Sequence, residues 1–164
     1  MAGKIIMNWH EYFIGIAELV KEKSKDRSTK VGAVLVDKDN GVLGVGYNGF
    51  PRGVNDNIDK RHKKSVKYFF TEHAERNAIY NAVRNGVKLD GSKLYISGKG
   101  GSCADCARAI IQSGIKEVIY IKGKFEGKGS WTKSINIAEE MLEEAGVKIS
   151  LLSDKFEVIE VIRK

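Results

Sequence analysis

Two pairs of residues in this sequence have the types and the spacing to bind a metal ion and to move a proton. His73 and Glu75 form an H-x-E pair, and Cys103 and Cys106 form a C-x-x-C pair that begins 30 residues after His73. One histidine and two thiolates are a ligand set of catalytic zinc sites, which keep a fourth position for water. A carboxylate beside that water can take its proton and deliver it to a substrate. We therefore predict one zinc ion held by His73, Cys103 and Cys106, with Glu75 as the catalytic proton carrier.

The same residues allow two simpler interpretations, which the joint pattern disfavours. A lone C-x-x-C pair can be a redox pair or half of a structural zinc site. The sequence has two cysteines in all, so a second C-x-x-C pair to complete a structural site is missing. A thioredoxin-like redox pair would follow the first strand of its domain, whereas Cys103 comes late in the chain. H-x-E followed by C-x-x-C is the pattern of zinc enzymes that deaminate nucleobases, and we favour that chemistry.

The elements that must position these residues can be predicted from apolar patterns and from helix caps. Both pairs fall at predicted helix starts, where unpaired backbone N–H groups favour thiolates. Strands alternate with helices in the second half of the chain, which indicates parallel crossovers. We predict an α/β fold, a three-layer α/β/α sandwich with a mixed central sheet of about five strands. The predicted helices are residues 8–23, 72–85, 104–112 and 132–145, the strand-like runs are residues 31–36, 42–47, 93–97, 117–121, 147–152 and 156–162, and a long polar loop runs from residue 48 to about 67.

Length and composition fit a single folded domain over residues 1–164. No run approaches the roughly 18 consecutive apolar residues of a membrane span, and the apolar run within residues 1–7 is too short for a signal peptide. With two cysteines spaced three apart and no export signal, we expect a reducing, cytoplasmic location. The 28 basic and 21 acidic residues give a net charge of +7. Because the basic residues are scattered, this charge fits anionic small molecules as well as nucleic acid.

Five stretches resemble the deoxycytidylate (dCMP) deaminases of the cytidine deaminase-like superfamily. SKDRSTKVGA at residues 24–33 resembles the family's SKDPxxxVGA segment, and GYNGFPRG at residues 46–53 resembles its GYNGxPxG loop. The other stretches are HAERNAI at residues 73–79, CADCAR at residues 103–108 and IQSGIKEV at residues 111–118. The GYNGxPxG loop is the most diagnostic, because base and nucleoside deaminases usually lack it. The resemblance implies a cytidine deaminase-like fold and hydrolytic deamination of a deoxynucleotide, first of all dCMP to dUMP with release of ammonia.

The resemblance also implies substrate contacts and partners. Asn48 would contact the sugar, since an amide can donate to and accept from a hydroxyl group, and Lys25 and Arg27 would bind the 5′-phosphate. Ala74 and Ser102 are further expected substrate contacts, Ser102 because it lies in the loop whose backbone walls the base pocket. Family members are commonly hexamers regulated by dCTP and dTTP. A homo-oligomer, these triphosphate effectors and accompanying Mg²⁺ are therefore expected as well.

Departures from the family pattern leave the identity of the substrate open. Ser102 stands where the family has proline directly before the first cysteine, and the glycine-rich segment 98–102 is longer by about two residues. Because glycine has more conformational freedom, this loop could widen the base pocket. The alternative substrates are dCTP, a 5-modified dCMP or a purine nucleotide. Arg27 also stands where the family has proline. An extra cation there would suit a substrate with more than one phosphate, but a tolerated surface substitution explains it nearly as well.

Two further classes of function compete with the nucleotide deaminase. A deaminase that edits a polynucleotide needs a basic groove with exposed aromatic side chains. Tyr68, Phe69 and Phe70 could stack on bases, but such residues more often pack the start of a helix. A zinc domain without activity would have no use for the Glu75 carboxylate. We therefore expect a small-molecule nucleotide as the partner, rather than nucleic acid or a membrane.

Overall fold

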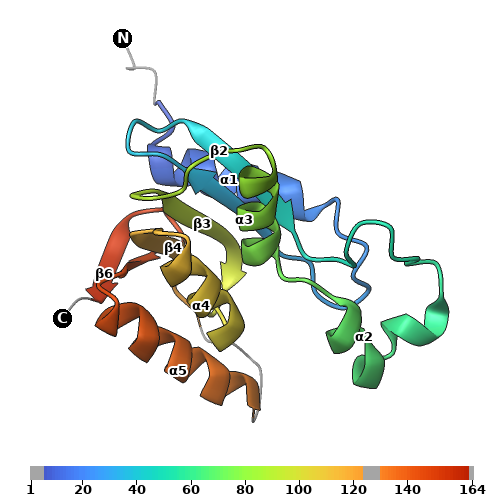
Figure 1. Cartoon of the computed structure of the whole chain (residues 1–164). Coiled ribbons are helices and arrows are strands. Elements are labelled where there is room, and N and C mark those ends of the chain that lie inside the picture. The colour runs from blue at the N-terminus through green and yellow to red at the C-terminus, as the bar shows by residue number, and fades with distance from the viewer. Residues whose placement is uncertain (1–5, 124–129, 163–164) are drawn as a thin grey trace.

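A single mixed sheet organises the chain. The structure, a computed structural model, describes residues 6–123 and 130–162 (Figure 1). Its six strands lie in the order β2-β1-β3-β4-β5-β6, which confirms the predicted α/β class with one strand more than the expected count of about five. The strands are β1 (Gly32–Val36), β2 (Val42–Tyr47), β3 (Lys93–Lys99), β4 (Glu117–Ile121), β5 (Lys148–Leu152) and β6 (Val158–Ile162). Residues 1–5, part of the N-terminal run that is too short for a signal peptide, lie outside the described residues.

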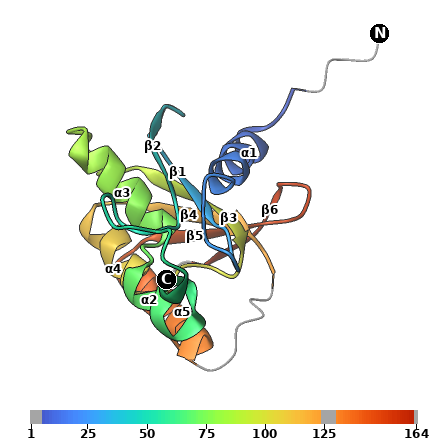
Figure 2. The same cartoon turned by 90° about the vertical axis from the view of Figure 1, so that its right-hand side faces the viewer.

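Helices cover the two faces of the sheet unequally, as Figures 1 and 2 show. Helix α1 packs on one face through Phe13, Ile14 and Ala17. Helices α3, α4 and α5 pack on the other face, where the larger apolar core lies. The chain is therefore the predicted three-layer α/β/α sandwich. The α-helices are α1 (Trp9–Lys21), α2 (Lys64–Phe70), α3 (Ala74–Arg84), α4 (Ala104–Gln112) and α5 (Ser130–Glu144).

Strand direction explains why residues from distant parts of the sequence meet at one edge of the sheet. Strands β3, β4 and β5 run parallel to one another, so the chain leaves β3 and β4 at the same edge. The segment after β3 leads to Cys103 and α4, and the segment after β4 leads to α5. Ligand sites of α/β sheets lie at this carboxyl edge of the parallel strands. The hairpin of β1 and β2 and the strand β6 pair antiparallel to their neighbours and complete the mixed sheet.

Close packing against Gly46 of strand β2 fixes helix α3, which carries the H-x-E pair at its start. A Cβ atom at Gly46 would lie 2.2 Å from the backbone nitrogen of Ala78 and 2.5 Å from the carbonyl oxygen of Ala74. Since real Cβ atoms do not approach backbone so closely, Gly46 allows α3 to lie directly on β2. The side-chain amide of Asn77 also donates to the carbonyl oxygen of Tyr47 at 2.8 Å. Strand β2 therefore sets the position of the N-terminus of α3.

The prediction that residues 48–67 form a long loop is wrong in part, because this segment contains a 3-10 helix (Asp59–His62) and runs into α2. Ring contacts hold it together: Phe50 stacks on His62 at a centroid distance of 5.0 Å and meets Phe70 at 5.5 Å. The guanidinium carbon of Arg61 lies 4.8 Å from the centre of the Phe70 ring. These contacts join residues far apart in the sequence, so local patterns do not reveal them.

Predicted helix ends agree well with the structure. The Asn8 side chain accepts a hydrogen bond from the backbone N–H of Glu11 at 2.9 Å and so caps α1. Gly86 and Gly146 follow α3 and α5 with φ angles of +73° and +71°, the left-handed conformation expected after a helix. Within residues 6–123 and 130–162, no helix is long and apolar enough to cross a membrane.

Candidate active site

The two residue pairs predicted from the sequence meet at the starts of two neighbouring helices. His73 is the N-cap of α3, Cys103 is the N-cap of α4, and Cys106 lies in the first turn of α4. The Nδ1 atom of His73 lies 3.4 Å from the Sγ atom of each cysteine, and the three ligand atoms lie within 4.8 Å of one another. Ligands of one tetrahedral zinc ion are separated by roughly 3.5 Å, given zinc bonds of 2.0–2.3 Å. The arrangement therefore fits one zinc ion.

The electrostatics of the cysteine pair favour a thiolate at Cys103, whereas the hydrogen bond to Cys103 and burial raise the pKa of the Cys106 thiol. Hydrogen bonds from the Cys106 thiol and from His73 lower the pKa of Cys103 to about 4, against the effect of burial. The thiolate, rather than the thiol, is the form that binds a metal ion. The lowered pKa of Cys103 therefore favours its thiolate form. The backbone N–H of Ala104, the next residue, donates to Oγ of Ser134 at 3.0 Å, which fixes the turn that carries this thiolate.

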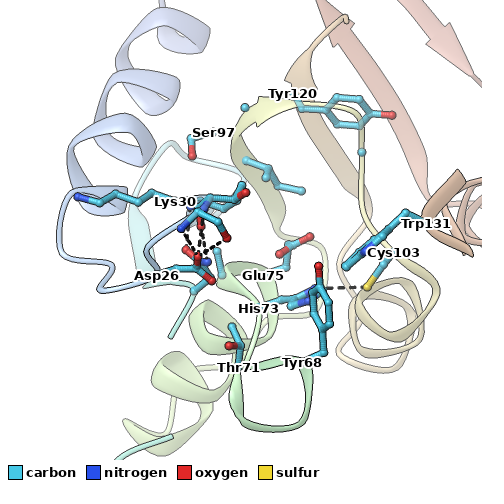
Figure 3. Close-up of a pocket in the computed structure, with 18 of the residues that line it drawn as sticks. Asp26, Lys30, Tyr68, Thr71, His73, Glu75, Ser97, Cys103, Tyr120 and Trp131 are labelled. Atoms are coloured by element: carbon cyan, nitrogen blue, oxygen red, sulfur yellow. Dashed lines mark hydrogen bonds between the residues drawn. The ribbon is translucent and has the colours of Figure 1, made fainter. Parts of the chain in front are cut away.

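Glu75 lies beside the three potential ligands but is not one of them in this geometry. Its side chain is buried, with 5% of the residue exposed, and it points into the same space as His73 and Cys103 (Figure 3). Burial raises the pKa of the Glu75 carboxyl group. A carboxyl group with a raised pKa both accepts and returns a proton more readily near neutral pH. Its position and environment therefore suit a proton carrier.

A cavity of about 290 Å³ opens over these residues. This volume is near the lower end of the range of small-molecule pockets, about 300–1,000 Å³. Of the predicted site residues, the lining includes Asn48, Ala74, Glu75, His73 and Cys103. The lining also includes polar, cationic and aromatic residues that the sequence analysis did not assign: Lys30, Lys67, Tyr68, Thr71, Ser97, Tyr120 and Trp131.

The predicted sugar and base contacts differ in their access to the cavity. Asn48 is 7% exposed, and its amide joins the wall of the cavity by accepting from the backbone N–H of Val31 and donating to the carbonyl oxygen of Thr29, both at 2.8 Å. Ala74 lies in the wall as the first residue of α3. Ser102 is buried outside the cavity lining, and its hydroxyl group has no hydrogen-bond partner among the described residues.

The structure does not bring Lys25 and Arg27 into the lining of this cavity. Lys25 forms an ion pair with Asp56 at 2.8 Å and lines a second cavity of about 170 Å³. Arg27 pairs with Asp59 at 2.7 Å, and both of these side chains are largely exposed. The family resemblance pointed to these two cations by their positions in the sequence, which do not tell which side chains of a loop turn inward.

A buried ion pair, Asp26 with Lys67, supports the loop that forms one wall of the cavity. Both oxygens of Asp26 lie 2.9 Å from Nζ of Lys67, and the two side chains are 6% and 13% exposed. The carboxylate also accepts from the backbone N–H groups of Ser28 and Thr29 at 2.8 and 3.0 Å. Burial alone would raise the pKa of Asp26, but these hydrogen bonds outweigh it and lower the pKa from 3.8 to about 2.

This ion pair predicts a specific loss of stability in acid. Because the pKa of Asp26 is lower in the folded chain, its contribution is complete above about pH 4 and is lost as the pH falls towards 2; it amounts to about 2 kcal/mol. We expect Asp26→Asn to reduce the free energy of unfolding at pH 6 by about this amount, with a smaller difference from the native chain at pH 2.5. Urea denaturation at the two pH values measures both. An equal difference at both values would contradict this assignment.

Three aromatic residues near the metal ligands were missed by the sequence analysis or left without a role. The Trp131 ring stacks on His73 with centroids 5.7 Å apart and an angle of 19° between the planes. Tyr68 lies 6.0 Å from Trp131 between ring centroids. Tyr120, like Ser97, comes near the carboxyl end of a parallel strand, where ligand sites are common, so strand position could have indicated both. Trp131 lies in no motif, and no feature of the sequence pointed to it.

Comparison with known proteins decides the family. The family described as "Cytidine and deoxycytidylate deaminase zinc-binding region" matches residues 7–122. The chain belongs to this family. The match contains all three potential metal ligands and Glu75, and it ends before α5 begins.

Relatives of the same family resemble the chain over most of its length. It is 35% identical to deoxycytidylate deaminase of Mus musculus over 158 residues, which cover 93% of this chain and 84% of that protein. It is 33% identical to the deoxycytidylate deaminase of Enterobacteria phage T2, with 82% of this chain and 87% of that protein covered. A crystal structure of the dCMP deaminase from cyanophage S-TIM5 in complex with dCMP and dUMP superimposes with a TM-score of 0.68 and 26% identity, covering 91% of this chain and 100% of that one. The fold is that of the cytidine deaminase-like family.

Proposed function

We propose that this chain is a zinc-dependent nucleotide deaminase that converts dCMP and water to dUMP and ammonia. The observation that carries the proposal is the meeting of His73, Cys103 and Cys106 around one point, with the buried carboxyl group of Glu75 in the same cavity. The names of the relatives, which include deoxycytidylate deaminases of animals and phages, support dCMP as the substrate.

His73, Cys103 and Cys106 would hold the zinc ion, as their donor types and separations allow. When bound, zinc supplies the Lewis acidity that makes a water molecule nucleophilic near neutral pH. Holding the ion at helix starts leaves one side of the ligand set facing the cavity, where a substrate can approach. Cys106 is fully buried and Cys103 is 6% exposed, so the protein also shields the sulfur atoms from competing reactions.

Glu75 would carry protons through the reaction. It takes a proton from the attacking water and gives it to N3 of the pyrimidine, while the oxygen bonds to C4. It then passes the second proton of that oxygen to the amine, so that the C4–N4 bond breaks and ammonia leaves. Each proton that Glu75 accepts is returned, so the carboxylate is regenerated at the end of a cycle.

The remaining site residues would bind and orient the nucleotide. The backbone N–H of Ala74, at the first position of α3, lies outside the hydrogen bonds of the helix and can donate to O2 of the base. Asn48 would stay the sugar contact, since its amide lines the cavity. Lys30, which lines the cavity, would bind the 5′-phosphate. Lys25 and Arg27 would join it only by leaving their partners Asp56 and Asp59. Ser102 would act through its backbone.

The experiment that tests this proposal is ammonia release by the zinc-loaded chain from a panel of nucleotides. The panel contains dCMP, dCTP, 5-methyl-dCMP, dAMP and a cytosine-containing single-stranded oligonucleotide. We expect dCMP to have the highest kcat/KM. A clear preference for dCTP, for a purine nucleotide or for the oligonucleotide would replace dCMP by that substrate, and no release from any of them would refute a deaminase function.

Assembly, regulation and location are proposed from the family resemblance. We propose a homo-oligomer, a hexamer by resemblance, that binds dCTP or dTTP with Mg²⁺ as effectors in the cytoplasm. Exposed apolar side chains on α1 and β6, such as Trp9 and Ile159 with 56% and 53% exposure, support burial against another copy. The second cavity beside Gly49 and Phe50 supports an effector site in the GYNG loop. Light scattering with and without dCTP and Mg²⁺ measures the mass, and a monomer under both conditions would contradict the proposed assembly.

A further inference from the structure

The first half of helix α5 contacts the candidate active site at several points, although α5 lies beyond the part of the chain that the family match covers. Trp131 stacks on His73, and the hydroxyl group of Ser134 accepts from the backbone N–H of Ala104, beside Cys103. Farther along the helix, burial acts together with the charge of Glu139 to raise the pKa of Tyr120, which lies in the cavity wall. Helix α5 is thus docked on the residues that form the site.

Among the residues of α5, Trp131 lines the cavity. Figure 3 shows Trp131 beside Cys103, whereas Glu75 lies beside His73. Its stacking on His73, at 5.7 Å and 19°, fixes the indole plane beside the metal ligands. Tyr68, at 6.0 Å from Trp131, flanks it from helix α2. The indole ring of Trp131 therefore forms an aromatic wall of the cavity together with the Tyr68 ring.

The chemistry of deamination determines which edge of a base meets this wall. The attacked C4 atom has to lie beside the metal ligands, and N3 has to face Glu75, since that carboxyl group protonates it. C5 is the other ring neighbour of C4, so it points away from Glu75. Trp131 and Tyr120 line the cavity on the side away from Glu75 (Figure 3), so C5 would point towards them. A substituent on C5, or the second ring of a purine, would meet the same wall.

We propose that Trp131 is a specificity-determining residue, whose indole ring limits the size of the group at the C5 edge of the base. This inference rests on the proposed deaminase function and deepens it. It locates the choice between unsubstituted cytosine and larger bases in helix α5, outside residues 7–122 that the zinc-binding region of the family matches. One extra or missing methylene-sized group of a substrate at such a pocket wall changes kcat/KM by about 10–200-fold.

The test compares dCMP with 5-iodo-dCMP, whose iodine atom enlarges the C5 edge. The quantity measured is the ratio of kcat/KM for 5-iodo-dCMP to that for dCMP, in the zinc-loaded native chain and in Trp131→Ala and Trp131→Phe. We expect Trp131→Ala to raise this ratio by about 10-fold or more, and Trp131→Phe to raise it less. Ile137→Ala is the matched control, because Ile137 lies on the same helix with 38% exposure outside the cavity lining, and it should leave the ratio unchanged.

The ratio separates specificity from a merely structural role. If Trp131 only supports His73 or the fold, Trp131→Ala lowers both rates together with zinc content and leaves the ratio as it is in the native chain. That result, with dCMP still converted by the native chain, would overturn the inference and leave the proposed function intact. Failure of the native chain to convert either nucleotide would instead refute the deaminase function, and the role of Trp131 with it.

Discussion

Glu75→Gln is expected to lower kcat for dCMP by about 10²–10⁴-fold while zinc content stays at one ion per chain. Glutamine has nearly the same size as glutamate but cannot take up and return a proton. Because Glu75 is buried beside the potential ligands without completing their set, its replacement should remove proton transfer and spare metal binding. Steady-state kinetics and metal analysis of the same preparation measure the two effects separately.

The matched control for Glu75 is Asp105→Asn. Asp105 lies between the two cysteines in sequence, but its side chain is 55% exposed and pairs with Arg108 on the surface. It contributes no atom to the lining of the cavity, so its loss of charge should leave kcat within about 2-fold, as for most surface substitutions. Equal activity of Glu75→Gln and the native chain would remove Glu75 from the reaction. Equal losses in both variants would point to a general effect of local charge.

Cys106→Ser is expected to abolish both zinc retention and activity. The sulfur atom of Cys106 lies 3.4 Å from Nδ1 of His73, and the residue is fully buried in the larger core. Serine replaces a thiolate with a hydroxyl group that stays protonated, so the ligand set is reduced to two. We expect zinc affinity to fall by more than about 100-fold, since loss of a direct ligand exceeds the 10–100-fold cost of losing an outer partner.

Zinc content after dialysis against a weak chelator measures the effect of Cys106→Ser, and circular dichroism checks that the fold is retained. Ser113→Ala is a matched control at the C-cap of the same helix, because the Ser113 hydroxyl donates to the carbonyl oxygen of Ile110 at 3.0 Å, at the opposite end of α4 from the ligands. This variant should keep both zinc and activity. A Cys106→Ser chain with its zinc and turnover intact would show that the ion is bound elsewhere.

Local sequence patterns predicted the scaffold and the arrangement of the potential metal ligands. The N-cap Asn8 and the glycines at 86 and 146 set helix ends that the structure reproduces, because capping depends on adjacent residues. The approach of His73 to Cys103 followed from placing both at helix starts on one edge of the sheet. Patterns of this kind carry most of the fold, since each is set within a few residues.

Features that depend on long-range contacts could not be predicted in the same way. Helix α2 is supported by the packing of Phe70 on Phe50, 20 residues apart in sequence. The turning of Lys25 and Arg27 towards Asp56 and Asp59, away from the lining of the larger cavity, likewise depends on partners more than 30 residues away. Trp131 reaches His73 because α5 packs beside α4, a placement that only the folded chain provides.

The most direct test of the account is a zinc titration of dCMP turnover. The chain is first freed of metal with a chelator, and the rate of dUMP formation is then measured against added zinc. The account predicts a rate near zero without metal, a linear rise, and saturation at one zinc ion per chain, with Glu75→Gln remaining inactive throughout. Full turnover of dCMP by the metal-free chain, or none at saturating zinc, would contradict it.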